Sequence, residues 1–523
     1  MKKLFITLAA VVAFAACSDD DEPAQLPAAP TIVLQGSDID QPIEITEEMT
    51  VKVDVKAPGT IAGFTVTIDS PALTEEILQT FGLGKELDLC NPGSMAGMLT
   101  TLGFPCGDKA VGQTDLSFDI SQLVPRIAMI YHETSDHKFT LAVTDAKEQT
   151  TTKTLTFHLT APATLTYNDD ADLWANTATV TAENLPDGAK VQYRVKDGEW
   201  QDAALTEGST YQIAPEWDET QNDAKLAIYD IKAGTGVFAG NTYEVRIAAE
   251  DGQAIGTPIE FDTRGGDTIP NGDMSGWSTI SRLGLFGPAI EVAYPNASEE
   301  EAFWDCGNNG VTTTLCISTD TDSSTDKKLV GEAAPAARLG SQNMMVLAAG
   351  NLFTGSFSYA NMTGTVDFGR KYPWTARPSA LKLKYTAKVD EIDIVRGSGN
   401  MVKDVAKGDP DNARIFVAIV DWNAPHQVES NMSTTKGSWD PEKTDTVDEG
   451  KILGYGSLKI SSPAELADAL KDLEIQIHWY DKEAKPAEGS YSLVISCACN
   501  EYGDYFTGCS TNVMYVDDFE WAY

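Results

Sequence analysis

The chain has 523 residues, and its 78 acidic side chains outnumber its 38 basic ones, which gives a formal net charge of −40. Such a surface repels phosphate, and no segment is rich in Lys and Arg, so we expect no nucleic acid partner. The length exceeds what one hydrophobic core supports, and we expect roughly two to four domains.

The N-terminus carries the features of an export signal. Basic Met1–Lys3 precede the uncharged stretch Leu4–Ala16, which is shorter than the span of about 20 residues that crosses a bilayer as a helix. Small residues precede Cys17, and this arrangement resembles the lipobox of bacterial lipoproteins, where the cysteine carries the lipid. We predict a signal peptide and lipobox over residues 1–17, with lipidation at Cys17. The alternative is an ordinary signal peptide with an incidental cysteine.

An acidic segment follows this cysteine. Ser18–Glu22 is rich in Asp and Glu, and such a run stays solvated. Directly after a lipidated cysteine it resembles the export signal of Bacteroides-type surface lipoproteins, which implies a lipid anchor in the outer membrane and a place on the cell surface. We predict an acidic linker over 18–29. The alternative is a plain linker that leaves the protein on the inner face of the outer membrane.

Residues 30–161 contain short segments that alternate apolar and polar side chains. Val51–Val55 and Phe64–Ile68 have the period of two that is typical of half-buried strands, and the Pro-Gly of Ala57–Gly59 forms a turn between them. The glycine-containing stretch 74–113 favours helix and loop. We predict an immunoglobulin-like sandwich with a helical insertion; it resembles the N-terminal Ig-like segments of Bacteroidetes surface lipoproteins.

Residues 163–264 show a second set of alternating segments. Val191–Val195 alternates, and Gly240–Ala248 resembles the fibronectin type III pattern, with Tyr243 placed as a tyrosine corner. We predict a fibronectin III-like domain that ends in the linker at Thr263–Asp267.

Residues 268–523 form the largest predicted domain. Its strand-like segments are Ala380–Val389, Arg414–Val420, Leu473–Trp479, Tyr491–Cys497 and Val513–Trp521. Ser462 with Glu465 resembles a capping box and predicts one amphipathic helix over Ser462–Leu473. The predicted fold class is therefore all-β: two Ig-like or fibronectin III-like sandwiches followed by a large jelly-roll β-sandwich.

Several separate blocks of this last domain resemble one family, the putative carbohydrate metabolism domain at the C-terminus of Bacteroidetes lipoproteins. In order along the chain, these blocks are Ile269–Trp277, Phe303–Asn308, Phe368–Leu381, Val417–Trp422, Tyr502–Gly508 and Val516–Glu520. The resemblance implies a β-sandwich similar to carbohydrate-binding modules, with a glycan or polysaccharide as partner. It implies no catalytic residues.

Aromatic residues beside polar ones are the candidate ligand-binding residues, because sugars offer apolar C–H faces and hydroxyl edges. The candidates are Trp304, Asp305, Arg370, Tyr372, Trp374, Arg377 and Trp422. For each ring the alternative is a place in the core. The Arg370–Arg377 loop, which is bounded by Gly and Pro and carries two Arg and two aromatic residues, favours a presented surface.

Hard oxygen ligands at both ends of this domain suggest a structural calcium ion. Asn271 and Asp273 at its start and Asp518 at its end would supply them if the first and last strands lie side by side. The alternative is that Asn-Gly-Asp forms only a turn and the acids are solvated. No other cofactor is expected.

Eight cysteines allow several disulfides. Cys17 is assigned to the lipid, and the pairs that the spacing permits are Cys90–Cys106, Cys306–Cys316 and Cys499–Cys509. The alternative is a set of buried thiols.

We expect no enzyme. The chain has no Gly-x-Ser-x-Gly and no glycine-rich phosphate loop, and His132 and His137 do not form His-Glu-x-x-His. No acidic pair lies in a recognisable motif. The first hypothesis is a surface lipoprotein that binds glycan through its jelly roll. The others are an adhesin or pilus-type component with a protein partner, and a glycan-active enzyme whose site the sequence does not reveal.

Overall fold

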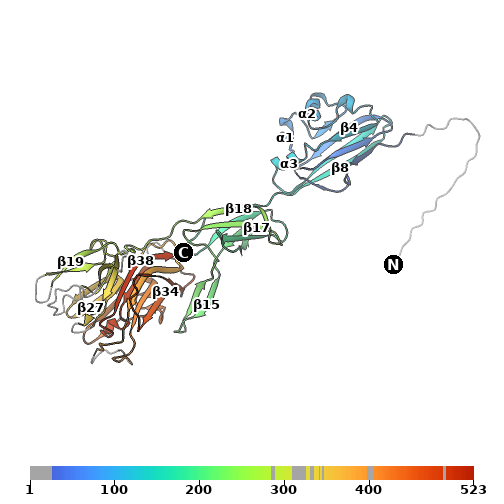
Figure 1. The fold of residues 1–523 in the computed structure, drawn as a ribbon. Coiled ribbons are helices and arrows are strands. Elements are labelled where there is room, and N and C mark those ends of the chain that lie inside the picture. The colour runs from blue at the N-terminus through green and yellow to red at the C-terminus, as the bar shows by residue number, and fades with distance from the viewer. Residues whose placement is uncertain are drawn as a thin grey trace, which may run out of the picture. The chain divides into compact units, whose positions relative to one another are not determined.

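The computed structural model describes residues 26–523 except 47, 284–288, 309–324, 330–334, 341, 344–346, 397–401, 403 and 487–490. The predicted signal peptide, Cys17 and Cys316 lie outside the described residues. The chain divides into two compact units, Met1–Pro162 and Ala163–Tyr523, and each is described by itself (Figure 1). Within the described residues no helix has the length and apolar character needed to cross a membrane.

The first unit is a sandwich of two sheets. The larger sheet runs in the order β2 (Ile43–Glu44), β8 (Thr150–Leu159), β7 (Ser135–Asp145), β4 (Ile61–Asp69) and β5 (Glu86–Asp88). The smaller sheet consists of β1 (Thr31–Leu34), β3 (Lys52–Lys56) and β6 (Asp115–Asp119). Alternate residues of these strands are buried, and their apolar side chains meet in one core.

Three short helices occupy the connections of the first unit, as the predicted helical insertion requires. They are α1 (Glu75–Thr80), α2 (Ala96–Thr101) and α3 (Pro125–Ile130). Thr74 caps α1, because its side chain accepts a hydrogen bond from the backbone N–H of Ile77. Each helix buries one apolar residue against the core of the sandwich, namely Leu78, Leu99 and Ile127.

The second unit begins with a small sandwich. One sheet has the order β13 (Ala204–Glu207), β14 (Thr210–Ile213), β10 (Ala178–Glu183) and β9 (Thr164–Tyr167). The other has the order β12 (Gln201–Asp202), β11 (Lys190–Val195), β17 (Thr242–Ala248) and β18 (Ala254–Asp262). Tyr243 is buried, and its hydroxyl accepts a hydrogen bond from the Phe238 backbone N–H at 2.8 Å, the kind of contact that a tyrosine corner makes.

The rest of the second unit is a large sandwich. Its first sheet is five-stranded, in the order β22 (Thr325–Leu329), β23 (Pro335–Gly340), β38 (Val513–Ala522), β29 (Ala380–Lys388) and β35 (Lys471–Gln476). The path of its second sheet follows the order β15 (Trp217–Gln221), β16 (Ala227–Ile231), β36 (His478–Trp479), β34 (Gly450–Ser461), β30 (Asn412–Trp422), β37 (Ser492–Ala498), β26 (Asn351–Ala360), β27 (Thr363–Phe368), β31 (His426–Ser430) and β32 (Thr435–Lys436).

Short strands complete the large sandwich. β21 (Trp304–Asp305) pairs with β26, β28 (Arg370–Lys371) pairs with β37, and β33 (Thr446–Val447) pairs with β34. The separate pairs are β19 (Ser278–Leu283) with β20 (Ala289–Tyr294), and β24 (Gln342–Asn343) with β25 (Leu347–Ala348). The predicted all-β fold class is confirmed by this architecture.

Both faces of the second sheet carry apolar clusters. Along β30, Ile415, Val417 and Ile419 point into the core between the two sheets, and Phe416 and Ala418 belong to a separate apolar cluster. Successive side chains of a strand point to opposite faces, so this second cluster lies on the face turned away from the sandwich core.

A hairpin from the small sandwich extends the second sheet. β15 and β16 pair with each other, and Tyr229 of β16 is in register with Trp479 of β36 (Figure 1). Gly454 of β34 leaves room for the Trp479 ring, since a Cβ at Gly454 would lie 2.8 Å from a ring atom. The predicted domains 163–264 and 268–523 therefore share a sheet.

The predicted helix over Ser462–Leu473 is wrong. Val389 and Ala464 form an isolated β-bridge, and Lys471 begins β35. The Ala467 backbone N–H donates to the Thr386 hydroxyl at 2.8 Å. Hydrogen bonding to β29 and the residue after it therefore decides the conformation of this segment. Intrinsic helix propensities of ordinary residues differ by only about 0–0.7 kcal/mol per residue, which is too little to oppose it.

Candidate functional site

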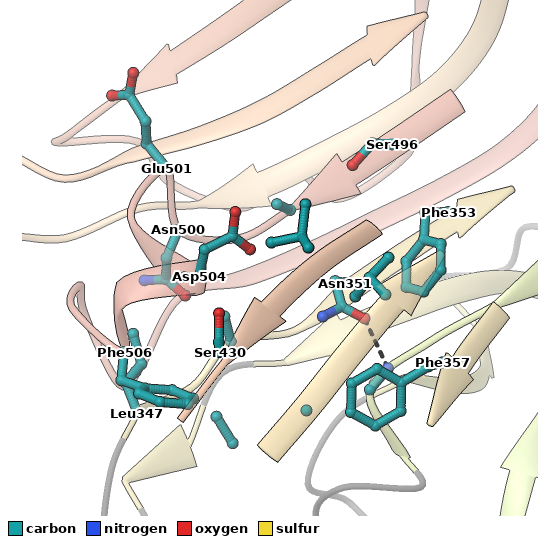
Figure 2. Close-up of a pocket in the computed structure, with 18 of the residues that line it drawn as sticks. Leu347, Asn351, Phe353, Phe357, Ser430, Ser496, Asn500, Glu501, Asp504 and Phe506 are labelled. Atoms are coloured by element: carbon teal, nitrogen blue, oxygen red, sulfur yellow. Dashed lines mark hydrogen bonds between the residues drawn. The ribbon is translucent and has the colours of Figure 1, made fainter. Parts of the chain in front are cut away.

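A cavity of about 460 Å³ opens on the outer face of the second sheet (Figure 2). Its volume falls within the range of about 300–1,000 Å³ that is usual for ligand pockets. Many of its lining residues come from β26, β27, β30, β31 and β37. The others lie outside these strands, at Gly307, residues 347–349, Met362, Met432, Trp439 and within residues 500–506.

Strand alternation explains why these side chains converge. Phe353, Phe357 and Tyr359 are spaced by even numbers along β26, so they point to one face of the sheet, as do Arg414 and Phe416 on β30. The same holds for Gly364, Val366 and Phe368 on β27, for Val428 and Ser430 on β31, and for Ser496 and Ala498 on β37.

Four aromatic rings of the cavity are only half-buried: Phe357, Tyr359, Trp439 and Phe506. Met362 and Met432, which also line it, are 65% and 49% exposed. Partly exposed aromatic and thioether groups offer flat or adaptable apolar contact at the edge of a concave site. The cavity can therefore take a ligand with an apolar face.

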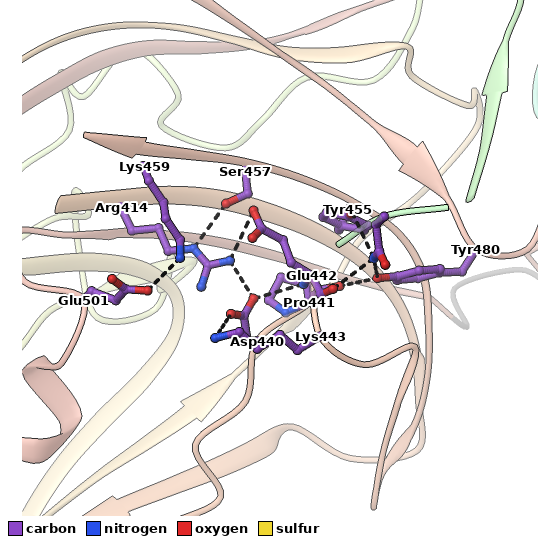
Figure 3. Close-up of polar contacts among 11 residues, drawn as sticks. Arg414, Asp440, Pro441, Glu442, Lys443, Tyr455, Ser457, Lys459, Tyr480 and Glu501 are labelled. Carbon is purple, nitrogen blue, oxygen red and sulfur yellow. Dashed lines mark hydrogen bonds and ion pairs between the residues drawn. The ribbon is translucent and has the colours of Figure 1, made fainter. Parts of the chain in front are cut away.

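Arg414 is the cationic side chain of the wall, and acidic neighbours neutralise it (Figure 3). One guanidinium nitrogen lies 2.6 Å from Asp440 Oδ1 and 3.5 Å from Glu442 Oε1, and Nε donates to the Ser457 hydroxyl at 3.1 Å. Burial alone would raise the pKa of Asp440, but Arg414 outweighs it and lowers that pKa to about 2. Asp440 therefore stays ionised at neutral pH.

Two carboxylates of the wall have different environments. Glu501 accepts hydrogen bonds from Lys459 and Asn412, both at 2.8 Å, and these contacts lower its pKa although burial acts in the opposite direction. Asp504 remains accessible from the cavity, but protein atoms crowd its carboxyl group, and this desolvation raises its pKa. The Glu501 carboxylate points away from Asp504 (Figure 2).

The predicted aromatic ligand platform is not presented on the surface. Tyr372, Trp374 and Trp304 are 2%, 8% and 0% exposed and belong to the core between the sheets. The Tyr372 hydroxyl donates to the Thr268 carbonyl at 2.7 Å, and Trp304 Nε1 donates to the Pro270 carbonyl at 2.7 Å. The interpretation of these rings as a ligand platform is wrong, because packing against the opposite sheet encloses them.

The two arginines of the same loop also point inward. Arg370 donates to the Gly355 carbonyl. Arg377 is 1% exposed, and its guanidinium carbon lies 4.5 Å from the ring centre of Trp479 and 5.2 Å from that of Trp174. Burial lowers the pKa of Arg377 to about 10. Because Trp174 belongs to the small sandwich, Arg377 joins the two sandwiches and does not face a ligand.

The remaining candidates, Trp422 and Asp305, support the cavity from behind. Trp422 is 2% exposed and packs edge-on against Trp439, with ring centres 5.2 Å apart. Asp305 accepts a hydrogen bond from the Phe357 backbone N–H at 2.7 Å. Neither lines the cavity. Because Trp422 is buried, the prediction that it contacts ligand is wrong, whereas a ligand contact of the half-buried Asp305 stays a prediction.

The residues predicted to bind calcium lie close together, but their oxygens have other partners. The Phe519 backbone N–H donates to the Gly272 carbonyl at 2.8 Å, so the two ends of the domain are adjacent. Asn271 Oδ1 accepts from the Gly276 N–H at 2.7 Å, Asp273 accepts from the Ser275 hydroxyl at 2.9 Å, and Asp518 pairs with Lys384 at 2.8 Å. In the described part of the chain, no group of three His, Cys, Asp or Glu has metal-binding geometry. The calcium site at Asn271, Asp273 and Asp518 stays a prediction.

The predicted disulfides are not formed where the structure describes both partners. Cys90 and Cys106 are thiols, and burial raises the pKa of each. No disulfide joins Cys499 to Cys509. Cys306–Cys316 involves a residue outside the described ranges.

The sequence contained one usable sign of the cavity. Trp439 lies between Gly437 and Pro441, the same Gly- and Pro-bounded setting that drew attention to the Arg370–Arg377 loop. Arg414 and Phe416 are two residues apart in a segment that the sequence predicts as a strand, so their side chains point to the same face. Nothing in the sequence indicates that Asp504 and Phe506 meet them.

The C-terminal region is thus a β-sandwich with a ligand-sized cavity on one sheet face. Its residues 286–522 match the family described as Putative carbohydrate metabolism domain. The chain therefore contains a carbohydrate-related domain, and every residue named above as lining the cavity falls within it. No curated protein matches the chain.

The solved structures that the chain matches include two from Bacteroides that are described as putative glycoside hydrolases. The one from Bacteroides vulgatus ATCC 8482 is 17% identical over 48% of this chain and 96% of its own, with a TM-score of 0.34. The one from Bacteroides thetaiotaomicron VPI-5482 is 18% identical over 65% and 98%, with a TM-score of 0.33. A third is SGBP-B of a Bacteroides ovatus mixed-linkage glucan utilization locus, in complex with a mixed-linkage heptasaccharide, at 9% identity over 90% and 100% and a TM-score of 0.14. Scores this low carry no information on activity.

Proposed function

We propose that the protein is a lipid-anchored outer-membrane protein of the cell surface that binds glycan in the cavity of its large sandwich. One observation carries the proposal: half-buried aromatic rings and polar side chains converge in a ligand-sized cavity within a carbohydrate-related domain. Aromatic faces suit the C–H surfaces of a sugar ring, and polar groups at fixed positions suit its hydroxyls.

Asp504 is the polar group best placed to accept hydrogen bonds from sugar hydroxyls. Its carboxylate accepts a long hydrogen bond from the Ser438 hydroxyl, at 3.3 Å, and the residue as a whole is exposed. A carboxylate can accept about four hydrogen bonds, so further acceptor positions are available to a ligand.

Binding is tested by removing rings from the cavity. Trp439→Ala and Tyr359→Ala, made in the mature chain, should each weaken binding to a responsive polysaccharide about tenfold or more in affinity gels and calorimetry, because each removes a stacking surface. Tyr385→Ala is the matched control: Tyr385 is also half-buried, but on β29 of the other sheet. The proposal fails if a broad panel of polysaccharides, mucin glycans included, shows no binding, or if the control weakens binding as much as the cavity variants.

Glycan hydrolysis at the same cavity is the second candidate. It is favoured by two carboxylates whose pKa values are shifted in opposite directions, down for Glu501 and up for Asp504. We rank it below binding because Lys459 and Asn412 already engage Glu501. A reducing-end assay on the polysaccharide that binds should show no release of sugar. Release that Asp504→Asn abolishes, with binding retained, would establish the enzyme.

The anchor is tested separately at Cys17. A Cys17→Ala variant expressed in the native host should lose the lipid, and the protein should leave the membrane fraction. External protease should degrade the wild-type protein on intact cells. Membrane association that survives Cys17→Ala would refute the lipid anchor, and full protection from protease would place the protein on the inner side.

A further inference from the structure

The tip of the β15–β16 hairpin reaches the segment that carries Trp439. Asn222, at the turn, donates from its side-chain amide to the Glu442 carbonyl at 2.9 Å and contacts the hydroxyls of Tyr480 at 3.0 Å and Tyr455 at 3.3 Å. Its side-chain oxygen accepts from the Leu226 N–H at 3.1 Å, which closes the turn. A residue of the small sandwich therefore holds backbone next to the cavity.

Residues 439–442 are held from two sides. On the hairpin side, Asn222 contacts Glu442, and the Tyr480 hydroxyl donates to the Pro441 carbonyl at 2.7 Å. On the cavity side, Arg414 pairs with Asp440 at 2.6 Å (Figure 3). The backbone between these contacts has little freedom to move.

This segment fixes one wall of the cavity. Trp439 adjoins Asp440 in the chain and packs against Phe416 and Trp422, with ring centres 5.4 and 5.2 Å apart. The Trp439 ring remains half-buried, so these ring contacts leave part of it accessible. Phe368 and His426 also contact the Trp439 ring, with ring centres 6.0 and 5.7 Å away. The contacts to the Pro441 and Glu442 carbonyls hold the backbone that follows it.

We infer that Asn222 is a positioning residue for the cavity and that the hairpin 217–231 belongs to the ligand-binding region. The inference rests on the glycan-binding function proposed above. It gives residues 163–264 a role beyond that of a spacer. Without the hairpin, ligand binding would have to order the segment that carries Trp439, and the free energy needed for this would lower the affinity.

The hairpin has independent attachments, so Asn222 can be changed without undocking it. Asp230 pairs with His478 at 2.7 Å, and Tyr229 stays in register with Trp479. Asn222 itself is partly exposed. Its loss should release residues 439–442 while the sheet remains intact.

Two Asn222 variants and one control test the inference in the mature chain. Asn222→Ala removes every side-chain contact, whereas Asn222→Asp keeps the oxygen that accepts from Leu226 but cannot donate to the Glu442 carbonyl. Asp223→Ala is the control, because Asp223 is exposed in the same turn. Hydrogen exchange is read at the amides of Glu442 and Lys443, both of which donate to Asp440, and affinity is read on the polysaccharide that binds.

Both Asn222 variants should speed exchange at these two amides by on the order of tenfold and weaken binding by a similar factor, with the main thermal transition retained. Asp223→Ala should match the wild type in both measurements. Wild-type exchange and affinity in both Asn222 variants would overturn the inference, as would weaker binding with unchanged exchange.

The exchange experiment needs no ligand, which separates the two proposals. If no polysaccharide binds the wild type, the proposed function fails, while the exchange result still decides whether Asn222 holds the segment. If the wild type binds and Asn222→Ala binds equally well, only the positioning role fails.

Discussion

Two aromatic loops of the large sandwich, each bounded by glycine and proline, lie on opposite sides of one sheet. Their aromatic rings are buried to different extents. The Arg370–Arg377 loop sends Tyr372 and Trp374 into the core between the sheets, whereas the loop around Trp439 packs on the outer face and leaves its ring half-buried. Both loops combine aromatic and charged residues, and so composition does not distinguish them. The difference comes from what covers each side.

The inner side is sealed by residues that are far away in the sequence. Trp174 packs against Trp374, and its Nε1 donates to the Ala484 carbonyl at 2.6 Å. On the outer side, no comparable layer lies over Phe357, Tyr359 and Trp439 in the part of the chain that the structure describes. In these two loops, the aromatic rings stay partly accessible only where no other described element encloses them.

The largest effect is expected at Arg377. Arg377→Ala should lower the free energy of unfolding of the second unit by about 5 kcal/mol, because it opens a space among tryptophan rings and leaves the Trp174 and Lys482 carbonyls without their donor. Urea denaturation followed by tryptophan fluorescence measures this, since all ten tryptophans lie after Pro162. A variant of normal stability that lost glycan binding would contradict the comparison and restore Arg377 as a ligand contact.

Trp374→Ala should lower the same free energy of unfolding by about 3 kcal/mol, which is typical for truncation of a buried aromatic residue. Its affinity for glycan should stay at the wild-type value under conditions where it is folded. Trp439→Ala should show the opposite balance, with the larger effect on affinity. Equal loss of affinity in both variants would remove the distinction between the two sides of the sheet.

A smaller effect is expected at Asp517 in β38, which is 3% exposed. Burial, together with the charges of Asp518 and Asp273, raises its pKa to about 6. Its unfolded value is about 3.9, so the folded state is destabilised above pH 6, and this penalty disappears as the pH falls from about 6 to 4.

Asp517→Asn should therefore raise the free energy of unfolding by about 1–3 kcal/mol at pH 8 and leave it unchanged at pH 4. Urea denaturation at the two pH values measures this. Asp518→Asn is the control, because its ion pair with Lys384 is exposed and should contribute no more than about 1 kcal/mol. If calcium addition stabilised the wild type and Asp517→Asn destabilised it at pH 8, the carboxylate would be a metal ligand.

The smallest effect is expected at the rim of the cavity. Met432→Gln keeps the length of an exposed side chain but removes its apolar character. We expect a two- to threefold loss of affinity, or about 0.5 kcal/mol, and no change in unfolding. A loss as large as that of Trp439→Ala would move the main contact from the aromatic wall to the rim.

Local patterns predicted the fold better than the site. Alternation in Val51–Val55 and Phe64–Ile68 predicted β3 and β4, because a sheet with one buried face imposes a period of two. The site depended on which face other elements cover. The covering residue Trp174 lies some two hundred residues before Arg377, and no local pattern contains that information. The lipid anchor and surface location remain predictions from the N-terminal sequence.

The hairpin β15–β16 also has a consequence for solubility. Without it, β36 and β34 would present unpaired backbone N–H and C=O groups to another copy of the chain, the arrangement from which edge-to-edge aggregation starts. The hairpin covers that edge, and its own outer strand carries Asp218 and Glu219, whose charges discourage further pairing. Because the hairpin precedes the large sandwich in the chain, it is synthesised first. The sheet can therefore close against its own chain before a neighbouring molecule can take that place.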